Sequence, residues 1–327
     1  MRIVGILCGG FLLVLSFCSD VWADIDINVG ERMMPTYGAE VVIVKDIVFD
    51  RYVLDDTYCY NGKPRRFQWD SMQRLLVELE ALQSRDICWV VLQNYRNKRG
   101  VAPDAKGVRF SSDEVLTDRY GVGRKHAIPL YCSNDLEVPD RYARDGSLCE
   151  YLADSAEYIK VYSHFYGGEW FVPKYYVMPL PVEIVSKVIF VDRTNQNITT
   201  LERGNDSVWY VRSMNPATTG RDNPPYQEPT PLGVYVVQEV KTKMYYLHDG
   251  TSSVAGFAPW ASRFTGGAYI HGVPLNTVEA GEEDYVDFSP TLGTVPRSHM
   301  CVRTATSHAR YIYDWAAPLE TVVVIIE

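Results

Sequence analysis

The clearest periodic pattern in the chain is a stretch of apolar residues at helical spacing. These residues recur every three or four positions, at Trp69, Met72, Leu75, Leu76, Leu79 and Leu82. Such spacing lines one face of a helix and predicts an amphipathic helix over residues 69–82. Asp70, with Gln73 three residues later, matches a capping box, so we predict that Asp70 caps the helix.

Most of the remaining apolar pattern is typical of strands and turns. Short apolar runs bounded by glycine, proline and polar turns predict strands at residues 126–131, 158–162, 169–173, 188–191, 198–201 and 209–211. Two prolines in the run Met-Pro-Leu-Pro at residues 178–181 restrict the backbone and predict a linker. We therefore predict a mainly β chain, with an N-terminal α/β segment at residues 24–110, a small barrel at 111–181 and an all-β domain at 182–327.

The first 23 residues have the pattern of an export signal. An apolar stretch over residues 3–17 is followed by a small-residue pattern at residues 21 and 23, which suits a signal peptidase. We expect export to the periplasm or cell envelope. A lipid anchor at Cys18 is the less favoured alternative, because the bulky Phe17 stands where lipoprotein cleavage sites have a small residue. No later run approaches twenty apolar residues, so we expect no transmembrane segment.

Composition and charge narrow the function class. With 46% hydrophobic and 22% charged residues the chain is an ordinary globular protein. Lys and Arg number 32 against 41 Asp and Glu, which gives a net charge of −9. Because an acidic surface repels phosphate groups, we expect no nucleic-acid partner.

The cysteines suggest one reactive thiol rather than a metal site. Removing the two in the signal from the total of seven leaves Cys59, Cys88, Cys132, Cys149 and Cys301. An odd number leaves at least one thiol without an intramolecular partner. Bridges between Cys132 and Cys149 and between Cys59 and Cys88 are one of three pairings open to those four. The five include no close C-x-x-C pair, so we expect no structural zinc.

Two motifs in the C-terminal domain carry candidate chemistry. The first is Tyr269-Ile270-His271-Gly272, and the second is Ser298-His299-Met300-Cys301-Val302-Arg303. A free cysteine has a pKa of about 8.5 and is mostly protonated at neutral pH, so a nucleophilic cysteine needs a base. An imidazole can take the thiol proton to form a thiolate–imidazolium pair. His271 is the candidate base, although a core histidine at a strand end is the alternative.

The charge around the second motif is positive in an acidic chain. Residues 297–313 contain Arg297, Arg303 and Arg310 and no acidic residue. An arginine beside a nucleophile suits a substrate that bears carboxylates, and Arg303 is the candidate for that role.

Together with the turn at residues 228–235 and Ala217-Thr218-Thr219-Gly220, these motifs resemble the YkuD-type L,D-transpeptidase family. That family has a His-Gly pair followed by a Ser/Thr-His-Gly-Cys core. The resemblance implies a β-sandwich, with Cys301 as nucleophile and His271 as base, and the Gly272 carbonyl orienting the base. It implies an oxyanion hole around Met300 and Cys301, for which His299 is either a helper or a brace of the loop.

The same resemblance implies the partners of the site. The substrate would be a peptidoglycan stem tetrapeptide, carbapenem-type inhibitors would react with the cysteine, and no metal or organic cofactor would be needed. Candidate substrate-binding residues are Arg303, Ser298, Met300 and Tyr269. An L,D-transpeptidase would form 3-3 cross-links through a thioester. Hydrolysis or D-amino-acid exchange on the same stems is one alternative, and a catalytically impaired wall-binding scaffold is another.

The chain departs from the family pattern in two places. Met300 stands where the family has glycine, which removes conformational freedom beside the cysteine. An acid-rich insertion at residues 277–288 lengthens the interval between the two motifs, and we expect it to cap the cleft.

The region before residue 181 carries a second resemblance. The run YIKVYSHFYGGEWFVPKYYVMPL, residues 158–180, resembles the last strands of bacterial SH3-like domains. A generic β-subdomain is the alternative, because short barrels share such turns.

Overall fold

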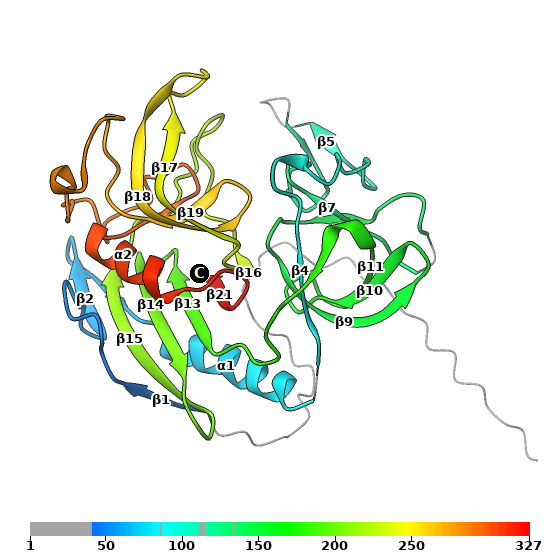
Figure 1. The fold of residues 1–327 in the computed structure, drawn as a ribbon, viewed down its shortest axis with the longest axis horizontal. Helices are drawn as coiled ribbons and strands as arrows, with labels where there is room; N and C mark the ends of the chain where they lie inside the picture. Colours follow the sequence, from blue (N-terminus) through cyan, green and yellow to red (C-terminus); the bar gives the residue numbers. More distant parts are fainter. Residues whose placement is uncertain (1–40, 86, 111–114, 134) are drawn as a thin grey trace, which may run out of the picture. The chain divides into compact units, whose positions relative to one another are not determined.

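Strands dominate the computed structural model, which describes residues 41–85, 87–110, 115–133 and 135–327 (Figure 1). With 42% strand and 12% helix, the prediction of a mainly β chain is confirmed. These residues lie within one compact unit, Tyr37–Glu327. The expected export signal lies outside the described residues. Within those ranges, no helix has the length and apolar character needed to span a bilayer.

The largest sheet has six strands in the order β1-β15-β14-β13-β21-β16. They are β1 (Val42–Lys45), β13 (Lys187–Asp192), β14 (Asn197–Arg203), β15 (Val208–Pro216), β16 (Gly233–Val236) and β21 (Thr321–Ile326). β1 pairs with β15 and β13 with β21 in parallel, and the other neighbours are antiparallel. The segment expected as a separate N-terminal part thus contributes an edge strand to this sheet.

Both faces of the six-stranded sheet are buried, which explains the unbroken apolar runs in β13 and β21. In β13, Val188 and Phe190 belong to one hydrophobic core, and Ile189 and Val191 belong to a second core. Successive side chains of a strand point to opposite faces, so the two cores lie on opposite sides of the sheet. The strands predicted at residues 188–191, 198–201 and 209–211 are confirmed as parts of β13, β14 and β15.

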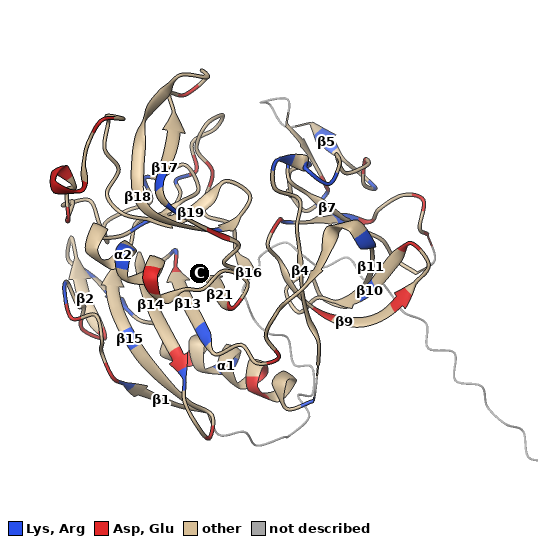
Figure 2. Ribbon diagram, viewed as in Figure 1, with Lys and Arg blue, Asp and Glu red and all other residues tan. Residues whose placement is uncertain are grey.

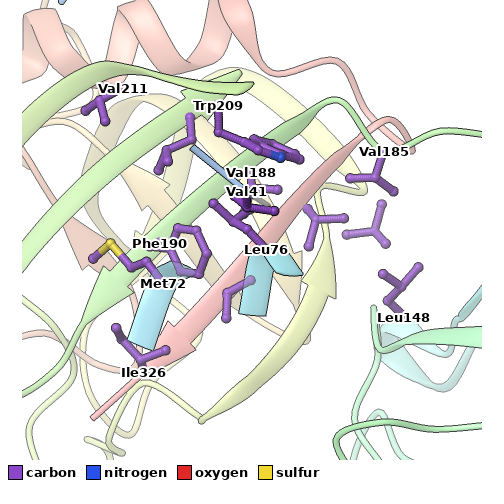
Figure 3. Packing of buried hydrophobic residues seen from close by; sticks show 14 of the residues in the cluster. Val41, Met72, Leu76, Leu148, Val185, Val188, Phe190, Trp209, Val211 and Ile326 are labelled. Atoms are coloured by element: carbon purple, nitrogen blue, oxygen red, sulfur yellow. The ribbon is translucent and has the colours of Figure 1, made fainter. Parts of the chain in front are cut away.

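The predicted helix is confirmed as α1 (Trp69–Gln83). It buries Met72 and Leu76 in the first core, together with Phe190 and Trp209 of the sheet (Figure 3). The buried Glu80 fastens the helix further, because its carboxylate accepts hydrogen bonds from Arg203 at 2.6 and 2.9 Å and from the indole of Trp209 at 2.8 Å.

The predicted cap of this helix is wrong. The helix begins one residue before Asp70, with Gln68 at the N-cap and no side-chain cap hydrogen bond. Gln68 Nε2 donates to Asp192 at 2.9 Å, and Gln73 Nε2 donates to the carbonyl of Val41 at 2.9 Å. Contacts with the sheet therefore override the local capping pattern.

A second sheet of four strands, in the order β17-β18-β19-β20, covers the other face of the six-stranded sheet. Its strands are β17 (Glu239–Leu247), β18 (Val254–Thr265), β19 (Ala268–His271) and β20 (Val302–Arg303). Phe264 and Ile270 of this sheet and Ile312 of helix α2 (Thr306–Trp315) fill the second core. We call these two sheets with α2 the C-terminal sandwich; all of its elements except β1 lie within residues 182–327.

Helix α2 corrects the expectation of an all-β C-terminal domain. Its sequence, TSHARYIYDW, is rich in β-branched and aromatic residues, which favour strands in isolation. The helix buries Thr306, His308, Ala309 and Ile312, which shows that packing against the sandwich decides its conformation.

A third sheet of five strands, in the order β11-β10-β9-β4-β12, lies N-terminal to the sandwich in sequence. It comprises β4 (Trp89–Leu92), β9 (Leu148–Ser155), β10 (Tyr158–Tyr162), β11 (Glu169–Pro173) and β12 (Val177–Pro179). The strands predicted at 158–162 and 169–173 are confirmed as β10 and β11. β4 comes from before the expected boundary at residue 110, and β12 includes two residues of the expected linker. We call residues 87–180 the five-stranded module; its SH3-like assignment stays a prediction.

The other elements of the described ranges are short. They are the pairs β2 (Thr57–Tyr60) with β3 (Lys63–Arg66), β5 (Arg109–Phe110) with β6 (Leu116–Thr117) and β7 (Ile128–Leu130) with β8 (Arg141–Ala143), and the 3-10 helices η1 (Tyr95–Asn97), η2 (Lys174–Tyr176) and η3 (Glu282–Asp284).

A buried ion cluster joins the five-stranded module to β18. The side chain of Asp145 has no exposed area and accepts hydrogen bonds from Arg263 Nη1 at 2.7 Å and from Gln238 Nε2 at 2.9 Å. The guanidinium of Arg263 also lies over the ring of Tyr95, 4.1 Å from its centre. We call Asp145, Arg263, Gln238 and Tyr95 the junction cluster.

The residue after Asp145 allows the two parts to approach closely. Gly146 has a φ of +86°, and a Cβ at this position would lie 2.0 Å from the carbonyl oxygen of Phe264. Any side chain here would clash with backbone and adopt a left-handed conformation that L-residues disfavour.

The disulfide pairing weighed from the sequence is wrong. Cys59, Cys88 and Cys149 are free thiols, so neither of the two bridges is formed. Cys149 is buried in the core of the five-stranded module, and burial raises the pKa of its thiol to about 12. Cys301 is also a free thiol.

Candidate active site

Two short paired strands bring the candidate base and the candidate nucleophile to one end of the sandwich. β19 ends at His271, and β20 begins directly after Cys301. The two strands run in parallel, with Ile270 opposite Val302 and His271 opposite Arg303. The two sequence motifs therefore fold back onto each other.

The thiol of Cys301 contacts the turn between β18 and β19. The residue is 8% exposed and packs against Ala261 and Tyr269. Its Sγ lies 3.7 Å from the carbonyl oxygen of Gly267 and accepts the backbone N–H of Tyr269. Burial raises the pKa of the Cys301 thiol, whereas this N–H and the charge of Arg303 lower it, and the net direction is upward. The thiol is protonated at rest.

The ring of His271 is held in one tautomer. Its Nδ1 lies 2.6 Å from the carbonyl oxygen of Gly272, which only accepts, so Nδ1 carries the proton and Nε2 is left as the basic atom. Gly272 lies against α2, where a Cβ would lie 2.8 Å from Thr306 Oγ1. The ring is 3% exposed. Burial first, and then the charge of Arg303, lower the pKa of His271 to about 4.

Both shifts favour neutral groups. A raised thiol pKa and a lowered imidazole pKa together disfavour a thiolate–imidazolium pair before substrate binds. The thiol of Cys301 donates to the Gly267 carbonyl, and no hydrogen bond joins it to the His271 ring among the described residues.

Met300 has a backbone conformation that is typical of glycine. Its φ is +94°, in the left-handed region that a residue with a Cβ seldom occupies. Holding such a residue costs on the order of 1–3 kcal/mol, and residues of this kind cluster at functional sites. The loop before the nucleophile thus contains a left-handed residue that carries a side chain.

The loop is braced from two sides. The hydroxyl of Ser298, which is 1% exposed, donates to the carbonyl of Cys301, and Thr230 Oγ1 donates to the carbonyl of Met300 at 2.8 Å. The N–H of Gly220 donates to Thr230 Oγ1 at 2.8 Å, and a Cβ on Gly220 would lie 2.8 Å from the Cα of Met300. The Ser298 hydroxyl is committed to the loop, so its assignment to substrate stays a prediction that this geometry does not favour.

Arg303 is the cation of the site. Its Nε is buried without a hydrogen-bond partner among the described residues, and none of their carboxylates forms a salt bridge with it. Burial lowers the pKa of Arg303, and the sulfur of Cys301 is among the groups that act on its charge. A partly buried cation without a counter-ion favours the binding of an anionic ligand.

The side chains of His299 and Tyr269 have other partners. His299 Nε2 lies 3.0 Å from Asp249 Oδ1, and both side chains are exposed. The ring of Tyr269 is 4% exposed, and its hydroxyl interacts with Tyr95 of the junction cluster. The geometry favours bracing for His299 and support of the strand for Tyr269.

The acid-rich insertion is anchored to its neighbours. Asp287 Oδ1 accepts the N–H of Ser307 at the start of α2 at 2.8 Å, and Asp287 Oδ2 accepts a hydrogen bond from Arg51 at 2.7 Å. Lys243 Nζ of β17 donates to the carbonyl of Ala280 at 2.7 Å. A role as a cap over the cleft stays a prediction.

Sequence reasoning missed Gly267 and the junction cluster. The carbonyl of Gly267 accepts a hydrogen bond from the thiol of Cys301, and Tyr95, which is distant in sequence, forms a hydrogen bond with Tyr269. Neither carries a local motif, since their positions follow from tertiary contacts. Asp145-Gly146 was the only local signal, as a turn with an acidic residue.

Residues 186–325 match the family of L,D-transpeptidase catalytic domains known as YkuD. This match covers less than half of the 327 residues. It coincides with the C-terminal sandwich and includes both motifs. No curated protein sequence matches the chain closely enough to count as a relative.

Several solved structures resemble the chain at low identity. An L,D-transpeptidase from Mycobacterium smegmatis is 15% identical, with a TM-score of 0.35, over 54% of this chain and 80% of that one. An L,D-transpeptidase from Mycobacterium tuberculosis is 19% identical, with a TM-score of 0.33, over 58% and 70%. A fused Zn-dependent amidase/peptidase/peptidoglycan-binding domain-containing protein from Clostridium acetobutylicum is 21% identical, with a TM-score of 0.31, over 45% of this chain and 53% of its own length. The chain thus spans about half the length of this last protein, and TM-scores this low carry no argument about activity.

Proposed function

We propose that this chain is an exported cysteine L,D-transpeptidase that acts on peptidoglycan stem tetrapeptides in the cell envelope. The observation that carries the proposal is the free thiol of Cys301 beside a strand that ends at His271, whose tautomer leaves Nε2 as a base. The match of residues 186–325 to L,D-transpeptidase catalytic domains supports it.

In the first step, the thiol turns away from the Gly267 carbonyl and gives its proton to His271 Nε2. The sulfur attacks the carbonyl that links the third residue of the stem to its terminal D-Ala, and an S–C bond forms. Because the thiol is protonated and the imidazole neutral at rest, the proton moves as the bond forms.

The developing oxyanion needs hydrogen-bond donors. The backbone N–H groups of Met300 and Cys301 donate to no acceptor among the described residues, which leaves them available. A donor placed in this way contributes about 3 kcal/mol to transition-state stabilisation. The positive φ of Met300 sets the orientation of these groups.

The intermediate then collapses. The C–N bond to D-Ala breaks, the proton on His271 passes to the departing amine, and a thioester on Cys301 remains. The amine of a second stem attacks the thioester and loses a proton to His271. The C–S bond then breaks, the 3-3 cross-link forms, and the proton on His271 returns to the sulfur of Cys301. Water in place of the amine gives L,D-carboxypeptidase activity at the same site.

Arg303 links binding to chemistry in this scheme. Burial and, after it, the charge of Arg303 lower the pKa of His271, which disfavours the imidazolium that forms during attack. A substrate carboxylate that pairs with Arg303 neutralises this charge and raises the proton affinity of the base. Substrate binding thereby prepares the site for proton transfer.

Product analysis tests the proposal. The unsubstituted chain, incubated with defined tetrapeptide muropeptides, should release D-Ala and form dimers, and Cys301→Ala should do neither. Cys59→Ala, which removes another free thiol, is the matched control and should keep full activity. Monomeric tripeptide as the sole product would indicate hydrolysis, and a folded chain without any product would favour the scaffold alternative.

A further inference from the structure

A cavity of about 400 Å³ lies between the five-stranded module and the turn from β18 to β19. It is lined by Tyr95, Arg96, Asn97, Lys125, His126 and Gly267. All but Gly267 belong to the five-stranded module. The cavity is therefore built mainly by a part of the chain outside the matched catalytic domain.

The cavity is adjacent to the nucleophile. Gly267 lines it, and the carbonyl oxygen of the same residue lies 3.7 Å from Cys301 Sγ. Gly267 is exposed, and a Cβ on it would meet no atom within 4 Å. A group held in the cavity is separated from the sulfur by a single glycine.

The wall of the cavity is cationic. Arg96 and Lys125 are exposed, and neither forms a salt bridge within the described ranges, although the whole chain is acidic. Figure 2 shows Lys and Arg positions on the loops near β5 and β7. The guanidinium of Arg96 lies over the ring of Tyr95, 5.2 Å from its centre, which leaves its charge without a carboxylate partner. Two cations without a salt bridge at one cavity favour an anionic ligand.

The two loops of the module that form the wall are fixed to each other. Asn97 Oδ1 accepts the N–H of His126 at 2.8 Å, and Asn94 Nδ2 donates to the carbonyl of Ala127 at 2.7 Å. Arg96, Asn97 and His126 have φ values of 57°, 53° and 66°. Neighbouring left-handed residues held by side-chain hydrogen bonds indicate a preorganised surface rather than a loose loop.

We propose that this cavity is a subsite for a carboxylate of the peptide substrate, with Arg96 and Lys125 as its binding cations. The proposal rests on the proposed function, because it assumes a peptide that bears carboxylates at Cys301. It assigns the five-stranded module a part in substrate recognition. The same chemistry serves a donor stem or an acceptor stem, and the experiment separates the two.

Steady-state kinetics of the full chain test the subsite. Arg96→Glu and Lys125→Glu should each raise KM at least about tenfold with kcat nearly unchanged, because each loses a charge-assisted hydrogen bond and places a negative charge against the carboxylate. D-Ala release reports a donor carboxylate, and dimer formation at saturating donor reports an acceptor carboxylate. Arg74→Glu is the matched control, because Arg74 is exposed on α1, which packs on the other face of the six-stranded sheet. Unchanged KM values in both assays would overturn the subsite, whereas no turnover by the unsubstituted chain would count against the proposed function.

The rate of alkylation of Cys301 tests whether the cavity binds a carboxylate, and it does not depend on turnover. Iodoacetate and iodoacetamide react with a thiol in the same way and differ by one carboxylate. The ratio of their rates at Cys301, measured by peptide mass mapping, should fall several-fold in Arg96→Glu and Lys125→Glu and stay constant in Arg74→Glu. A ratio that is equal in all four proteins would overturn the proposal, whatever the chain does with stem peptides.

Discussion

Two arginines on the four-stranded sheet occupy opposite environments. Arg263 of β18 is paired with Asp145 and Glu239 and lies over the ring of Tyr95. Arg303 of β20 leaves its Nε buried and unpartnered within the described ranges. The junction cluster and the loop at Cys301 thus differ in whether their charges are satisfied within the fold. Arg263, which has counter-ions, holds the five-stranded module and the sandwich together, whereas Arg303, which has none among the described residues, is available to bind an anionic ligand.

Removing the counter-ion at the junction should have the largest effect. Asp145→Ala leaves Arg263 buried with only the more exposed Glu239, and breaking a buried ion pair from one side costs about 3–5 kcal/mol. Denaturant unfolding should show a loss of stability of this size. Asp154→Ala removes an exposed pair with Lys174 and serves as control. A loss no greater than that of the control would show that the junction is not a stabilising contact.

Removing the second arginine should separate activity from stability. Arg303→Met should lower the rate of Cys301 acylation about 10- to 100-fold, because the substrate carboxylate loses its charge-assisted partner. The free energy of unfolding should not fall, since the cation has no counter-ion to lose. Arg263→Met, in contrast, should lower the free energy of unfolding, because Asp145 loses its ion-pair partner. Equal destabilisation by both substitutions would remove the distinction between the two regions.

The pH dependence of kcat/KM should change when Arg303 is replaced. The pKa of His271 is lowered to about 4 by burial and by Arg303, so the base stays neutral and active down to about that pH. The acid limb of kcat/KM, which reports the free enzyme, should lie near pH 4 and shift upward in Arg303→Met. An unshifted limb in the variant would show that Arg303 does not act on the base.

The same pKa shift links stability to pH. The unfolded chain protonates this ring near pH 6.5, and the folded chain does so only near 4. Stability that is present above pH 6.5 is therefore lost as the pH falls from 6.5 toward 4. His271→Gln should weaken the dependence in that window without abolishing it, because burial also lowers the pKa of His308, to about 3.

The smallest effect should come from Met300. Met300→Gly relieves a φ of +94° but makes the unfolded chain more flexible and removes a partly buried side chain. We expect a net gain of about 1 kcal/mol in the free energy of unfolding. Thermal unfolding at matched conditions measures it. A clear loss of stability would show that the thioether contacts outweigh the strain.

The sequence predicts the parts of this molecule that depend on local pattern. The helix at residues 69–83 and the strands β10, β11 and β13 follow from periodicity and turn residues. The pairing of the His271 and Cys301 motifs also follows from the family resemblance, and Met300 stands out because glycine is expected there.

The rest depends on contacts that no local pattern encodes. The cap at Asp70 fails because Gln68 and Gln73 bond to the sheet instead. Helix α2 is missed because packing overrides its strand-favouring residues. The junction cluster and the cationic cavity arise where Asp145, Tyr95 and Gly267, far apart in sequence, meet in the fold.

The central claim is that Cys301 is an activated nucleophile, and its reaction with a carbapenem tests this most directly. Intact-mass spectrometry of the folded chain after incubation with imipenem should show one covalent adduct, which peptide mapping places on Cys301. The adduct should be absent in Cys301→Ala and present in Cys59→Ala. A folded, unsubstituted chain that forms no adduct, or that forms it at Cys59 or Cys88, would contradict the account.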